Sequence, residues 1–480
     1  MGYLNDERCG LDILLVQPPN EDAFITTEST HIPTGLGALA AYLENQNKNI
    51  STEILDMRIY HNPYKLFFKI LRDKKPKIVG LPSYTPALHK TVEVAQKTKK
   101  FSPEIKVIVG GMHATALPIE TIQTYDCFDY LVYGEGEVTL YELLISLKNE
   151  KDTLSLKGTA VRLDGKVKLN PPRELVKDID SLPFLARGKI DMLRYKRLPM
   201  SYLRLPTTEM TTARGCSYSC IFCPGHIVWG NGIRSMSPER VIKEITHCID
   251  DYSIRDIFFV DDVFTWPKTR IVDICNSFIK NGLGISWSCY SRVDTVDYDL
   301  LRLMRKAGCY NIKYGIEAGT EKSLKAINKG TSLKQAEDAV RWTKMARIEC
   351  FTSFIIGFGG ESEADIKQTI NFAKKLNPDL ADFRIAASFP GTQLFEDCKH
   401  GNNSTPSLTP ELFEDTPFGS MFLTNLIASP LRKKAYLSFY SSPKWIWQLF
   451  MSLFKNPRRE IKKICYGIFV IWRLLKAGRG

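Results

Sequence analysis

Three cysteines in the middle of the chain, Cys216, Cys220 and Cys223, limit what the surrounding residues can fold around. They lie in the stretch TTARGCSYSCIFCPG, residues 211–225. A short loop lets three thiolates converge on three corners of one [4Fe–4S] cube, whereas an extended strand would splay them. No fourth cysteine follows nearby, so one iron would have no protein ligand. Because clusters that only carry electrons normally have four thiolates, this pattern indicates chemistry at an open iron.

A zinc site and an unrelated group of core cysteines are the alternatives to a cluster. Structural zinc sites usually combine a C-x2-C pair with a second pair of ligands. The one nearby candidate, His226, lies only three residues after Cys223. Spacing and context therefore favour the cluster, and Phe222, between the last two cysteines, would add an aromatic face beside it.

The first third of the chain alternates between strand-like and helix-like segments. Short apolar runs occur at about 11–16, 51–55, 77–81, 106–109 and 130–133, and helical stretches at about 34–44, 65–73, 86–100 and 117–124 separate them. Apolar runs this short and continuous are typical of strands that are buried on both faces. The alternation predicts an α/β fold with a doubly wound, Rossmann-like parallel sheet.

The loops after these strands contain glycines and hydroxyls where a ligand would be expected. Ligands of open parallel sheets bind at the carboxyl ends of the strands. Glycine lets the backbone approach a large ligand, and hydroxyls can bond its amides or phosphate. The candidate residues are Ser83, Tyr84, Thr85, Gly110, Gly111, His113, Thr115, Gly134, Glu135 and Gly136. Each alone is weak evidence, because a glycine after a strand usually only makes a turn.

A connector at 146–205 leads to a second α/β pattern. It contains turn signals at 164–165 and 171–172 and a predicted hairpin between Gly158 and Leu169. From Glu209 onward, strands at about 209–213, 255–260, 285–290, 311–316, 350–356 and 381–387 alternate with helices at about 238–251, 268–281, 297–307, 333–347 and 362–376. Six βα units predict a partial barrel that is open on one side.

Residues that packing does not readily explain fall at the ends of these strands, where barrels place their active groups. Asp261 and Asp262 are adjacent acids, which destabilise each other unless something positive lies opposite. Arg292 follows the third strand, and Glu317 lies between two glycines in the fourth. The fifth strand ends in small residues, Gly357 to Gly359, which would admit a flat ring. Ordinary salt-bridged residues are the alternative at the charged positions.

Together these motifs resemble the cobalamin-binding radical S-adenosylmethionine (radical SAM) enzymes. The C-x3-C-x2-C spacing is similar to the radical SAM signature, and the phrases GGMHAT (110–115) and GEGE (134–137) are similar to the cobalamin domain that precedes it in many members. The resemblance implies a Rossmann-like cobalamin domain over 1–145, a connector over 146–205, a partial (β/α)6 radical SAM barrel over 206–400 and a helical, basic and aromatic region over 401–480. It also implies a [4Fe–4S] cluster, S-adenosylmethionine, cobalamin and an external electron donor of the flavodoxin or ferredoxin type.

The resemblance further implies roles for the residues at the strand ends. The amino and carboxylate groups of S-adenosylmethionine would chelate the fourth iron, with Asp261 or Asp262 near the amino group and Arg292 near the carboxylate. Glu317 would lie near the ribose or the amino group, and Gly357 to Gly359 under the adenine. Many members have Gly-Gly-Glu where this chain has its acidic pair, so the choice between the two acids stays open.

The resemblance also implies that cobalamin binds without a histidine on cobalt. The D-x-H-x-x-G motif that places a histidine on the metal in some cobalamin proteins is absent, because Asp56 and His61 do not have its spacing. The loop after the third strand would then cover the lower face of the corrin, and Tyr84 is the candidate for that position. His113 is expected to orient its loop rather than to bind cobalt.

Three functions are compatible with these motifs. The first is methylation of an unactivated carbon, in which a 5′-deoxyadenosyl radical removes hydrogen and methylcobalamin then delivers the methyl group, at the expense of two molecules of S-adenosylmethionine. The second is a radical oxidation, ring closure or rearrangement, as in the anaerobic tetrapyrrole cyclases of the same superfamily. The third, from another class, is a non-catalytic cobalamin or iron–sulfur sensor at a membrane.

The carboxyl-terminal tail carries almost all of the net charge. Of a total of +12, residues 431–480 contribute +11, from twelve Lys and Arg against Glu460, so no general nucleic-acid-binding surface is indicated. The apolar stretches 444–454 and 464–475 are shorter than the ~20 residues of a spanning helix. Their Trp, Phe and flanking cations suit a helix that lies on anionic lipid, which would favour a lipid-like substrate over other small molecules. Packing of the tail on the barrel is the alternative.

The start of the chain and the cysteine count bear on the compartment. The sequence MGYLNDERCG is polar and lacks the features of a signal peptide. Twelve cysteines without such a signal suggest a reducing environment, and most of those outside the cluster are expected to be small buried apolar residues. The protein is therefore expected in the cytoplasm, at the inner face of the membrane if the tail binds lipid.

Overall fold

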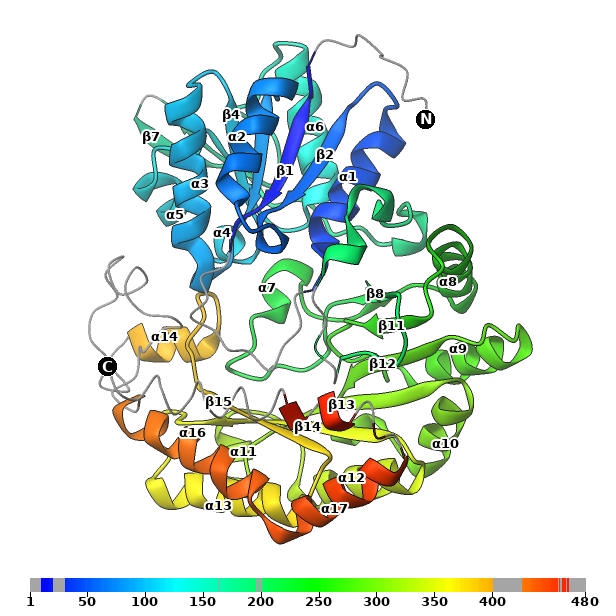
Figure 1. Cartoon of the computed structure of the whole chain (residues 1–480). Coiled ribbons are helices and arrows are strands. Elements are labelled where there is room, and N and C mark those ends of the chain that lie inside the picture. The colour runs from blue at the N-terminus through cyan, green and yellow to red at the C-terminus, as the bar shows by residue number, and fades with distance from the viewer. Residues whose placement is uncertain are drawn as a thin grey trace.

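Two sheets, one in each half of the chain, organise the fold (Figure 1). The computed structural model describes residues 10–19, 31–163, 165–195, 198, 201–399, 425–455, 457, 460–462 and 464–465. In Figure 1 the amino-terminal sheet lies above the second sheet, and the short helices α4 (Met112–Ala116) and α7 (Gly225–Trp229) lie between them. The predicted α/β class, a Rossmann-like unit followed by a partial barrel, is confirmed.

The amino-terminal sheet contains five parallel strands in the order β2-β1-β3-β4-β5. They are β1 (Ile13–Gln17), β2 (Thr52–Asp56), β3 (Ile78–Pro82), β4 (Lys106–Gly110) and β5 (Tyr130–Val132). Leu14 and Val16 of β1 pack under α2 (Pro63–Lys74), α3 (Leu88–Phe101) and α5 (Pro118–Thr124). Ile13 and Leu15 pack under α1 (Thr34–Gln46) and α6 (Gly136–Lys148) on the other face. Because helices cover both faces, the strands are continuous apolar runs.

The hairpin predicted in the connector belongs to this sheet. β6 (Thr159–Leu163) pairs antiparallel with β5, and β7 (Lys166–Leu169) pairs antiparallel with β6. The sheet therefore has seven strands and continues to Leu169, past the domain end predicted at residue 145. Periodicity predicted both strands but could not show which sheet they join, because their partner β5 lies outside the hairpin.

The second sheet consists of six parallel strands in the order β8-β11-β12-β13-β14-β15. They are β8 (Thr207–Met210), β11 (Asp256–Phe259), β12 (Ser286–Ser291), β13 (Cys309–Glu317), β14 (Glu349–Ile356) and β15 (Leu380–Ile385). The longer helices between successive strands are α8 (Pro238–Tyr252), α9 (Lys268–Lys280), α10 (Tyr298–Lys306), α12 (Leu333–Met345) and α13 (Glu363–Leu376), and the short helix α11 (Glu321–Ala326) precedes α12. The predicted series of βα units is present.

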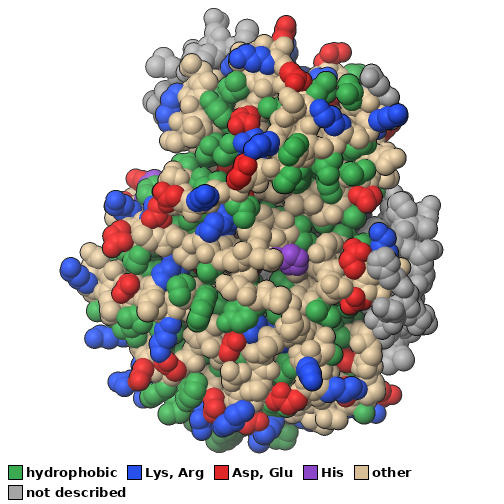
Figure 2. All heavy atoms as spheres, turned by 180° about the vertical axis from the view of Figure 1, so that it is seen from behind, with side chains coloured by type: hydrophobic (Ala, Val, Ile, Leu, Met, Phe, Trp, Pro, Cys, Tyr) green, Lys and Arg blue, Asp and Glu red, His purple; other side chains and the backbone are tan. Residues whose placement is uncertain are grey.

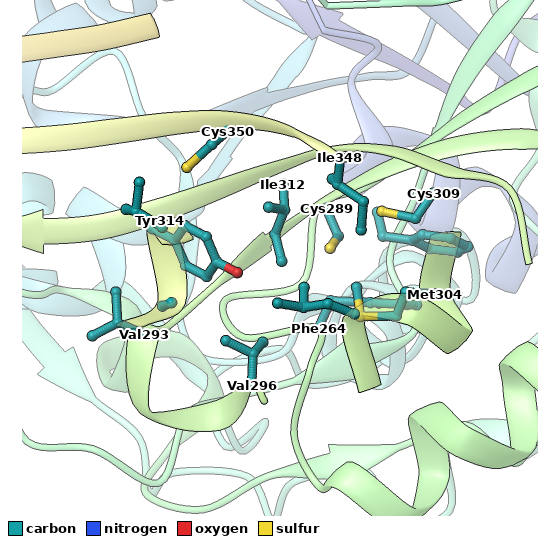
Figure 3. Close-up of a cluster of buried hydrophobic side chains, with 14 of the residues drawn as sticks. Phe264, Cys289, Val293, Val296, Met304, Cys309, Ile312, Tyr314, Ile348 and Cys350 are labelled. Atoms are coloured by element: carbon teal, nitrogen blue, oxygen red, sulfur yellow. The ribbon is translucent and has the colours of Figure 1, made fainter. Parts of the chain in front are cut away.

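One face of the second sheet is covered by a continuous core, part of which is shown in Figure 3. Phe264, Met304, Ile312 and Tyr314 meet there between the strands and the helices. The cysteines outside the cluster loop follow the expectation of small buried residues at these positions: Cys127, Cys248, Cys275, Cys289, Cys309, Cys350 and Cys398. Cys465 is exposed, and Cys9 lies outside the described residues.

Two helices of the tail cover the far edge of the second sheet. Along α16 (Asn425–Tyr440), the Tyr440 hydroxyl donates to the Ala381 carbonyl of β15 at 2.8 Å. In α17 (Pro443–Lys455), Trp445 Nε1 donates to the Asp379 carbonyl at 3.0 Å. Covering an edge strand protects its backbone groups from other chains. Packing on the barrel is thus confirmed for this part of the tail, whereas most of the apolar stretch 464–475 lies outside the described residues.

Within the described ranges, no helix has both the length and the apolar character needed to cross a bilayer. The face of the molecule shown in Figure 2 carries Lys and Arg side chains interspersed with Asp and Glu. Positive charge is therefore not concentrated on that face.

Candidate functional site

The cysteine loop is closed by a two-stranded ribbon. β9 (Ala213–Arg214) pairs antiparallel with β10 (Arg234–Ser235), and all three cysteines lie between them. Gly215 has φ +85°, and a Cβ there would lie 2.2 Å from the Gly232 carbonyl oxygen, so only glycine lets the two arms approach. The Cys223 N–H donates to the Cys220 carbonyl at 3.1 Å. The residues between the two strands are thereby folded into one compact loop.

The donor set of this loop fits a [4Fe–4S] cluster. All three thiols are free and only partly buried. Within the described part of the chain, no three His, Cys, Asp or Glu side chains are grouped tightly enough for a single metal ion. This is compatible with a cluster, whose cysteines each bind a different iron. Burial raises the pKa of the Cys223 thiol to about 11 and also raises that of Cys216, so iron would be needed to hold them as thiolates.

Arg292 lies against the second cysteine. Its Nη1 is 3.8 Å from Cys220 Sγ, and its guanidinium carbon is 3.5 Å from the centroid of the Tyr218 ring. It donates to both carboxylate oxygens of Asp294 at 2.9 Å and to the Lys329 carbonyl at 2.7 Å. The guanidinium is therefore fixed beside the sulfur, where a permanent positive charge stabilises a thiolate.

The structure separates the two acids of the predicted pair. Asp261 is buried and accepts hydrogen bonds from the Thr212 hydroxyl and from two backbone N–H groups at 2.5–3.0 Å. It therefore fixes the backbone that leads into the cysteine loop. Asp262 is exposed and has no hydrogen-bond partner among the described residues. A Cβ on Gly225 would lie 3.4 Å from Asp262 Oδ2 and 3.5 Å from Cys223 Sγ, so this free carboxylate and the thiol approach the same point.

Glu317 forms a buried ion pair with Lys329 at 2.9 Å. Its φ of +71° lies in the left-handed region, and the pairing of β13 with β14 shifts register between Gly315 and Glu317. A Cβ on Gly315 would lie only 2.3 Å from Glu317 Oε1, so the carboxylate needs glycine there. Backbone strain of this kind clusters at functional sites. The Lys329 carbonyl also accepts from Arg292, which connects the ion pair to the cysteine loop.

The glycine loop after β14 is held by an acid that the sequence did not single out. Glu361 Oε2 accepts hydrogen bonds from the N–H groups of Gly357 at 2.8 Å and Phe358 at 3.1 Å. The Phe358 ring packs on Phe222, with centroids 5.5 Å apart. The segment from Gly357 to Gly359 therefore lies beside the cysteine loop. A carboxylate that caps a loop is not visible from sequence spacing alone, which is why Glu361 was missed.

In the amino-terminal half, most of the singled-out polar residues bind one another. Ser83 Oγ donates to the Gly110 carbonyl at 2.7 Å, and the Thr85 hydroxyl lies 3.0 Å from His113 Nδ1. Thr115 Oγ1 accepts from the Gly134 N–H at 3.1 Å. These bonds tie the loops after β3, β4 and β5 into one surface.

Two glycines of these loops are required by close packing. Gly111 has φ +94°, and a Cβ there would lie 3.1 Å from the backbone of Ser83. A Cβ on Gly136 would lie 3.2 Å from Leu39 Cδ2, so this glycine lets α6 start close to α1. Burial lowers the pKa of His113 to about 4, so its ring is neutral at pH 7. A neutral ring that bonds Thr85 orients the loop.

Tyr84 differs from its neighbours. Its side chain is 48% exposed, and its hydroxyl makes no hydrogen bond with any residue that the structure describes. Surrounding protein nevertheless raises the pKa of Tyr84, against the effect of nearby Arg58. The ring is thus enclosed on some sides and open on others, which is the environment expected of a residue that meets a ligand.

Glu135 joins the amino-terminal sheet to the cysteine loop. Arg214, two residues before Cys216, donates Nη1 to Glu135 at 2.8 Å and Nη2 to Glu137 at 2.5 Å. Arg234, on the other strand of the ribbon, donates to both oxygens of Glu135 at 2.9 and 3.1 Å. The carboxylate that was predicted to meet cobalamin is therefore engaged by protein cations. The sequence did not reveal this, because Arg214 lies 79 residues from Glu135.

The two halves of the protein meet next to the cysteines. A Cβ on Gly391 would lie 3.3 Å from Ala116 Cβ at the end of α4 and 2.7 Å from Ile227 Cδ1 on α7. The loops at the carboxyl ends of the first sheet therefore lie on the side that faces the cysteine loop (Figure 1). A large flat ligand on those loops would lie opposite the open iron of a cluster.

Comparisons with known proteins match both halves. The model of the radical SAM superfamily matches residues 210–373, and that of the B12 binding domain matches residues 21–144. An uncharacterized methyltransferase of Pyrococcus horikoshii is 33% identical over 465 residues, which are 96% of this chain and 99% of the relative. An anaerobic magnesium-protoporphyrin IX monomethyl ester cyclase of Rubrivivax gelatinosus is 28% identical over 330 residues, 67% of this chain and 58% of the relative.

A solved structure agrees with the fold. The cobalamin-dependent S-adenosylmethionine radical enzyme OxsB, with aqua-cobalamin and S-adenosylmethionine bound, superposes with a TM-score of 0.70 at 19% identity. The match covers 94% of this chain and 72% of OxsB. The arrangement of a Rossmann-like unit over a partial barrel is therefore shared.

Proposed function

Because the chain belongs to the cobalamin-binding radical SAM enzymes, we propose that it is a methyltransferase that acts on an unactivated carbon of a small molecule. Its cofactors are a [4Fe–4S] cluster, S-adenosylmethionine and cobalamin. One observation carries the proposal: the loops after β3, β4 and β5 face the three-cysteine loop, so a substrate between them has a cofactor on each side. The Pyrococcus horikoshii relative, similar over almost its whole length, is a methyltransferase by name.

When bound, the cluster and S-adenosylmethionine supply a 5′-deoxyadenosyl radical, and cobalamin supplies the methyl group. Cys216, Cys220 and Cys223 hold the cluster in this proposal, and Arg292 keeps a positive charge beside Cys220. Asp262 binds the amino group of S-adenosylmethionine, because its carboxylate is free and lies close to Cys223. Asp261 is instead a positioning residue for the loop.

The remaining residues orient the two organic cofactors. The loop from Gly357 to Gly359, held by Glu361, lies under the adenine. Glu317 is aimed by its ion pair with Lys329 toward the ribose or the amino group. Tyr84 covers the lower face of the corrin. Its side chain is about half exposed, whereas other polar groups of the loops after β3, β4 and β5 hydrogen-bond to one another.

Methyl transfer is tested with the anaerobically reconstituted protein, methyl-labelled S-adenosylmethionine and a small-molecule extract of the source cells. We expect label in a product and formation of 5′-deoxyadenosine. Cys220→Ala should abolish both and lower the bound iron, whereas Cys275→Ala, which removes a thiol from the core of the second sheet, should keep both. Bound metal other than iron, or full activity of Cys220→Ala, would contradict the proposal.

The cyclase relative favours a second candidate, a radical oxidation or ring closure in which cobalamin handles electrons. The same incubation separates the two. Substrate consumption with 5′-deoxyadenosine but no label in the product would reject methylation and support the second candidate. In either case an external one-electron donor of the flavodoxin or ferredoxin type and a cytoplasmic site of action are part of the proposal.

We also propose that α17 contacts anionic lipid. Trp445 and Gln448 of this helix hydrogen-bond to the rest of the protein. Five other large apolar side chains of the helix are 44–72% exposed: Ile446, Trp447, Phe450, Met451 and Phe454. Their spacing places them on one side of the helix. Since residues 431–480 carry a charge of +11, the surface that complements this helix is an anionic membrane.

Vesicle flotation tests the lipid contact. The protein should float with vesicles that contain phosphatidylglycerol and less with pure phosphatidylcholine, and added salt should weaken the contact. Trp447→Gln with Phe450→Gln should abolish flotation, whereas Leu193→Gln, which alters an exposed leucine elsewhere, should not. Equal flotation of the double variant and the wild type would rule out α17 as the contact.

A further inference from the structure

One face of the second sheet carries side chains that neither the core nor the cysteine loop uses. Strand β14 alternates between partly exposed and buried residues along its whole length. Its buried residues belong to the helix-covered core, so the others lie on the opposite face. We call this the open face, and it comprises Phe258, Tyr290, Lys313, Gly315, Phe351, Ser353 and Ile355.

Lys313 lies in the middle of the open face, inside a ring of aromatic side chains. The strand register places Tyr290, Lys313 and Phe351 side by side on β12, β13 and β14. The Lys313 Nζ lies 4.1 Å from the centroid of the Phe258 ring, 5.3 Å from that of Tyr290 and 5.8 Å from that of Phe351. Cation–π contact stabilises the ammonium from the sides but provides no acceptor for its N–H groups.

Within the described part of the chain, Lys313 lacks the anionic partner that a lysine in such a position usually has. No hydrogen bond or ion pair joins Lys313 to another residue in the described ranges. The two acids that act most strongly on Lys313 already have other partners, since Glu209 lies 2.6 Å from His31 Nδ1 and Asp382 accepts from Arg384 Nε at 2.9 Å. A partly buried ammonium with three unused donors is unfavourable unless a further group supplies acceptors.

The charge state agrees with this geometry. Burial lowers the pKa of Lys313 to about 8, so the side chain is still protonated at pH 7. The ionisable groups that act on it are Glu209, Asp382, Cys289 and Glu349, with Tyr290 in the aromatic ring around it. The carboxylates favour the charged form but do not touch it.

The open face leads from Lys313 to the cysteine loop along a single strand. Lys313, Gly315 and Glu317 follow at every second residue of β13, and at a rise of about 3.3 Å per residue the first and last Cα atoms are at most roughly 13 Å apart. The register shift between Gly315 and Glu317 shortens this distance. Because Gly315 has no side chain, the Glu317 carboxylate and Lys329 Nζ lie against it, at 2.3 and 3.2 Å from the position that a Cβ would take. This ion pair therefore lies between Lys313 and the cysteine loop. Glu317 is connected through Lys329 to Arg292, which touches Cys220. A molecule of one or two rings anchored at Lys313 would therefore reach the level of the cysteine loop.

We infer that Lys313 anchors an anionic group of the substrate, while Phe258, Tyr290 and Phe351 hold the apolar or aromatic part beside it. This inference rests on the proposed function, because it assigns the substrate site of the same enzyme. The substrate class is a small organic anion, with a carboxylate or phosphate attached to an apolar body. Its anionic end lies deep on the open face, and its reacting carbon lies near the cysteines.

The first test uses the holoenzyme with methyl-labelled S-adenosylmethionine and an extract of the source cells that has been split on an anion exchanger. Label should enter product with the retained fraction and not with the unretained one. Lys313→Met should lower incorporation at least about tenfold, the effect of losing a charged hydrogen bond, and should raise the ratio of 5′-deoxyadenosine to methylated product. Lys313→Arg should raise KM more than it lowers kcat.

Lys334→Met is the matched control, since it removes an exposed lysine of α12 and should leave labelling unchanged. Label that enters product only with the unretained fraction, or full incorporation by Lys313→Met, would overturn the anchor. If the wild type labels no product with either fraction, the result counts against methyl transfer and not against the role of Lys313. The role of Lys313 is then decided by a binding measurement that needs no turnover.

That measurement is NMR of the protein with ¹³C-methylated lysines, in which Lys313→Met identifies the signal of Lys313. Phenyl phosphate is the anionic probe and phenol the neutral one. We expect phenyl phosphate to shift the Lys313 signal saturably and to raise the pKa of Lys313, and phenol to do neither. An unchanged Lys313 signal, or the same shift with both probes, would refute the anchor whatever the outcome of the labelling.

Discussion

Replacing Arg214 by methionine tests the ion pairs that join the amino-terminal half of the protein to the cysteine loop. Arg214 donates to Glu135 at 2.8 Å and to Glu137 at 2.5 Å, and its guanidinium carbon lies 4.8 Å from the centroid of the Trp229 ring. Methionine keeps much of the apolar stem but removes every donor. The variant therefore leaves two carboxylates without this cation.

The expected loss of stability follows from the burial of the three side chains. Removing one partner of a buried ion pair costs about 3–5 kcal/mol, against about 0–1 kcal/mol for an exposed pair. Arg214 is 10% exposed, Glu135 4% and Glu137 6%, so the buried range applies. Glu135 keeps its bonds with Arg234 and the Val176 N–H, whereas no second cation pairs with Glu137 among the described residues. We therefore expect the lower end, about 3 kcal/mol.

Urea unfolding followed by circular dichroism measures this loss. Because the chain has more than one unit and need not unfold in two states, the first transition is the one to compare. Arg341→Met is the matched control, since it removes an exposed ion pair with Asp338 and should cost less than about 1 kcal/mol. Adding Glu137→Gln to Arg214→Met should restore part of the loss, because no unpaired carboxylate remains at Glu137. A loss no larger than that of Arg341→Met, or further destabilisation by the second substitution, would refute the argument.

Three further outcomes follow from the structure. Lys313→Met should be at least as stable as the wild type at pH 7, because it removes a partly buried charge that has no anionic partner among the described residues. Between pH 8 and 10.5 Lys313 is protonated in the unfolded chain but not in the folded one, so the stability of the wild type rises with pH. The stability advantage of Lys313→Met should therefore shrink over this range. Gly315→Ala should lower the melting temperature, because its Cβ would displace Glu317 from Lys329, and a crystal structure with the ion pair intact would contradict this. The pKa of His113 is about 4 in the folded protein, so between pH 6.5 and 4 the unfolded chain binds a proton that the folded protein does not. Acidification over this range should remove on the order of 3 kcal/mol of stability through His113. His113→Asn should lack that part of the pH dependence in urea titrations.

The architecture could be predicted because its signals are local. Buried parallel strands are short apolar runs, and the cysteine loop can be identified from the spacing of three cysteines within eight residues of sequence. The hairpin of β6 and β7 was predicted as two strands, but its place in the first sheet depends on a partner that periodicity does not identify. Pairing over long distances is a property of the folded chain.

The roles of single residues were harder to predict, because they depend on how deeply each side chain is buried and on which way it points. Asp261 and Asp262 are neighbours, yet Asp261 fixes the backbone of the loop and Asp262 has no hydrogen-bond partner in the part of the chain that the structure describes. Glu135 lies in a phrase that resembles a cofactor loop, but its cations come from the ribbon around the cysteines. Lys313 was overlooked although a signal existed, since a lysine in the middle of the otherwise largely buried strand CYNIKYGIE is unusual.

Three of the residues to which we assign ligands share one physical property. Tyr84, Asp262 and Lys313 have no hydrogen-bond partner for their side chains among the described residues, although protein surrounds each of them enough to shift its pKa by desolvation. Folded proteins seldom leave desolvated polar groups unpaired. Asp261 and Glu135, which the sequence also singled out, accept hydrogen bonds from other residues of the protein. Tyr84 lies on the loops of the first sheet, Asp262 at the cysteine loop and Lys313 on the open face. A side chain with this property thus lies at the proposed place of each of the three molecules that the reaction must bring together: cobalamin, S-adenosylmethionine and an anionic substrate.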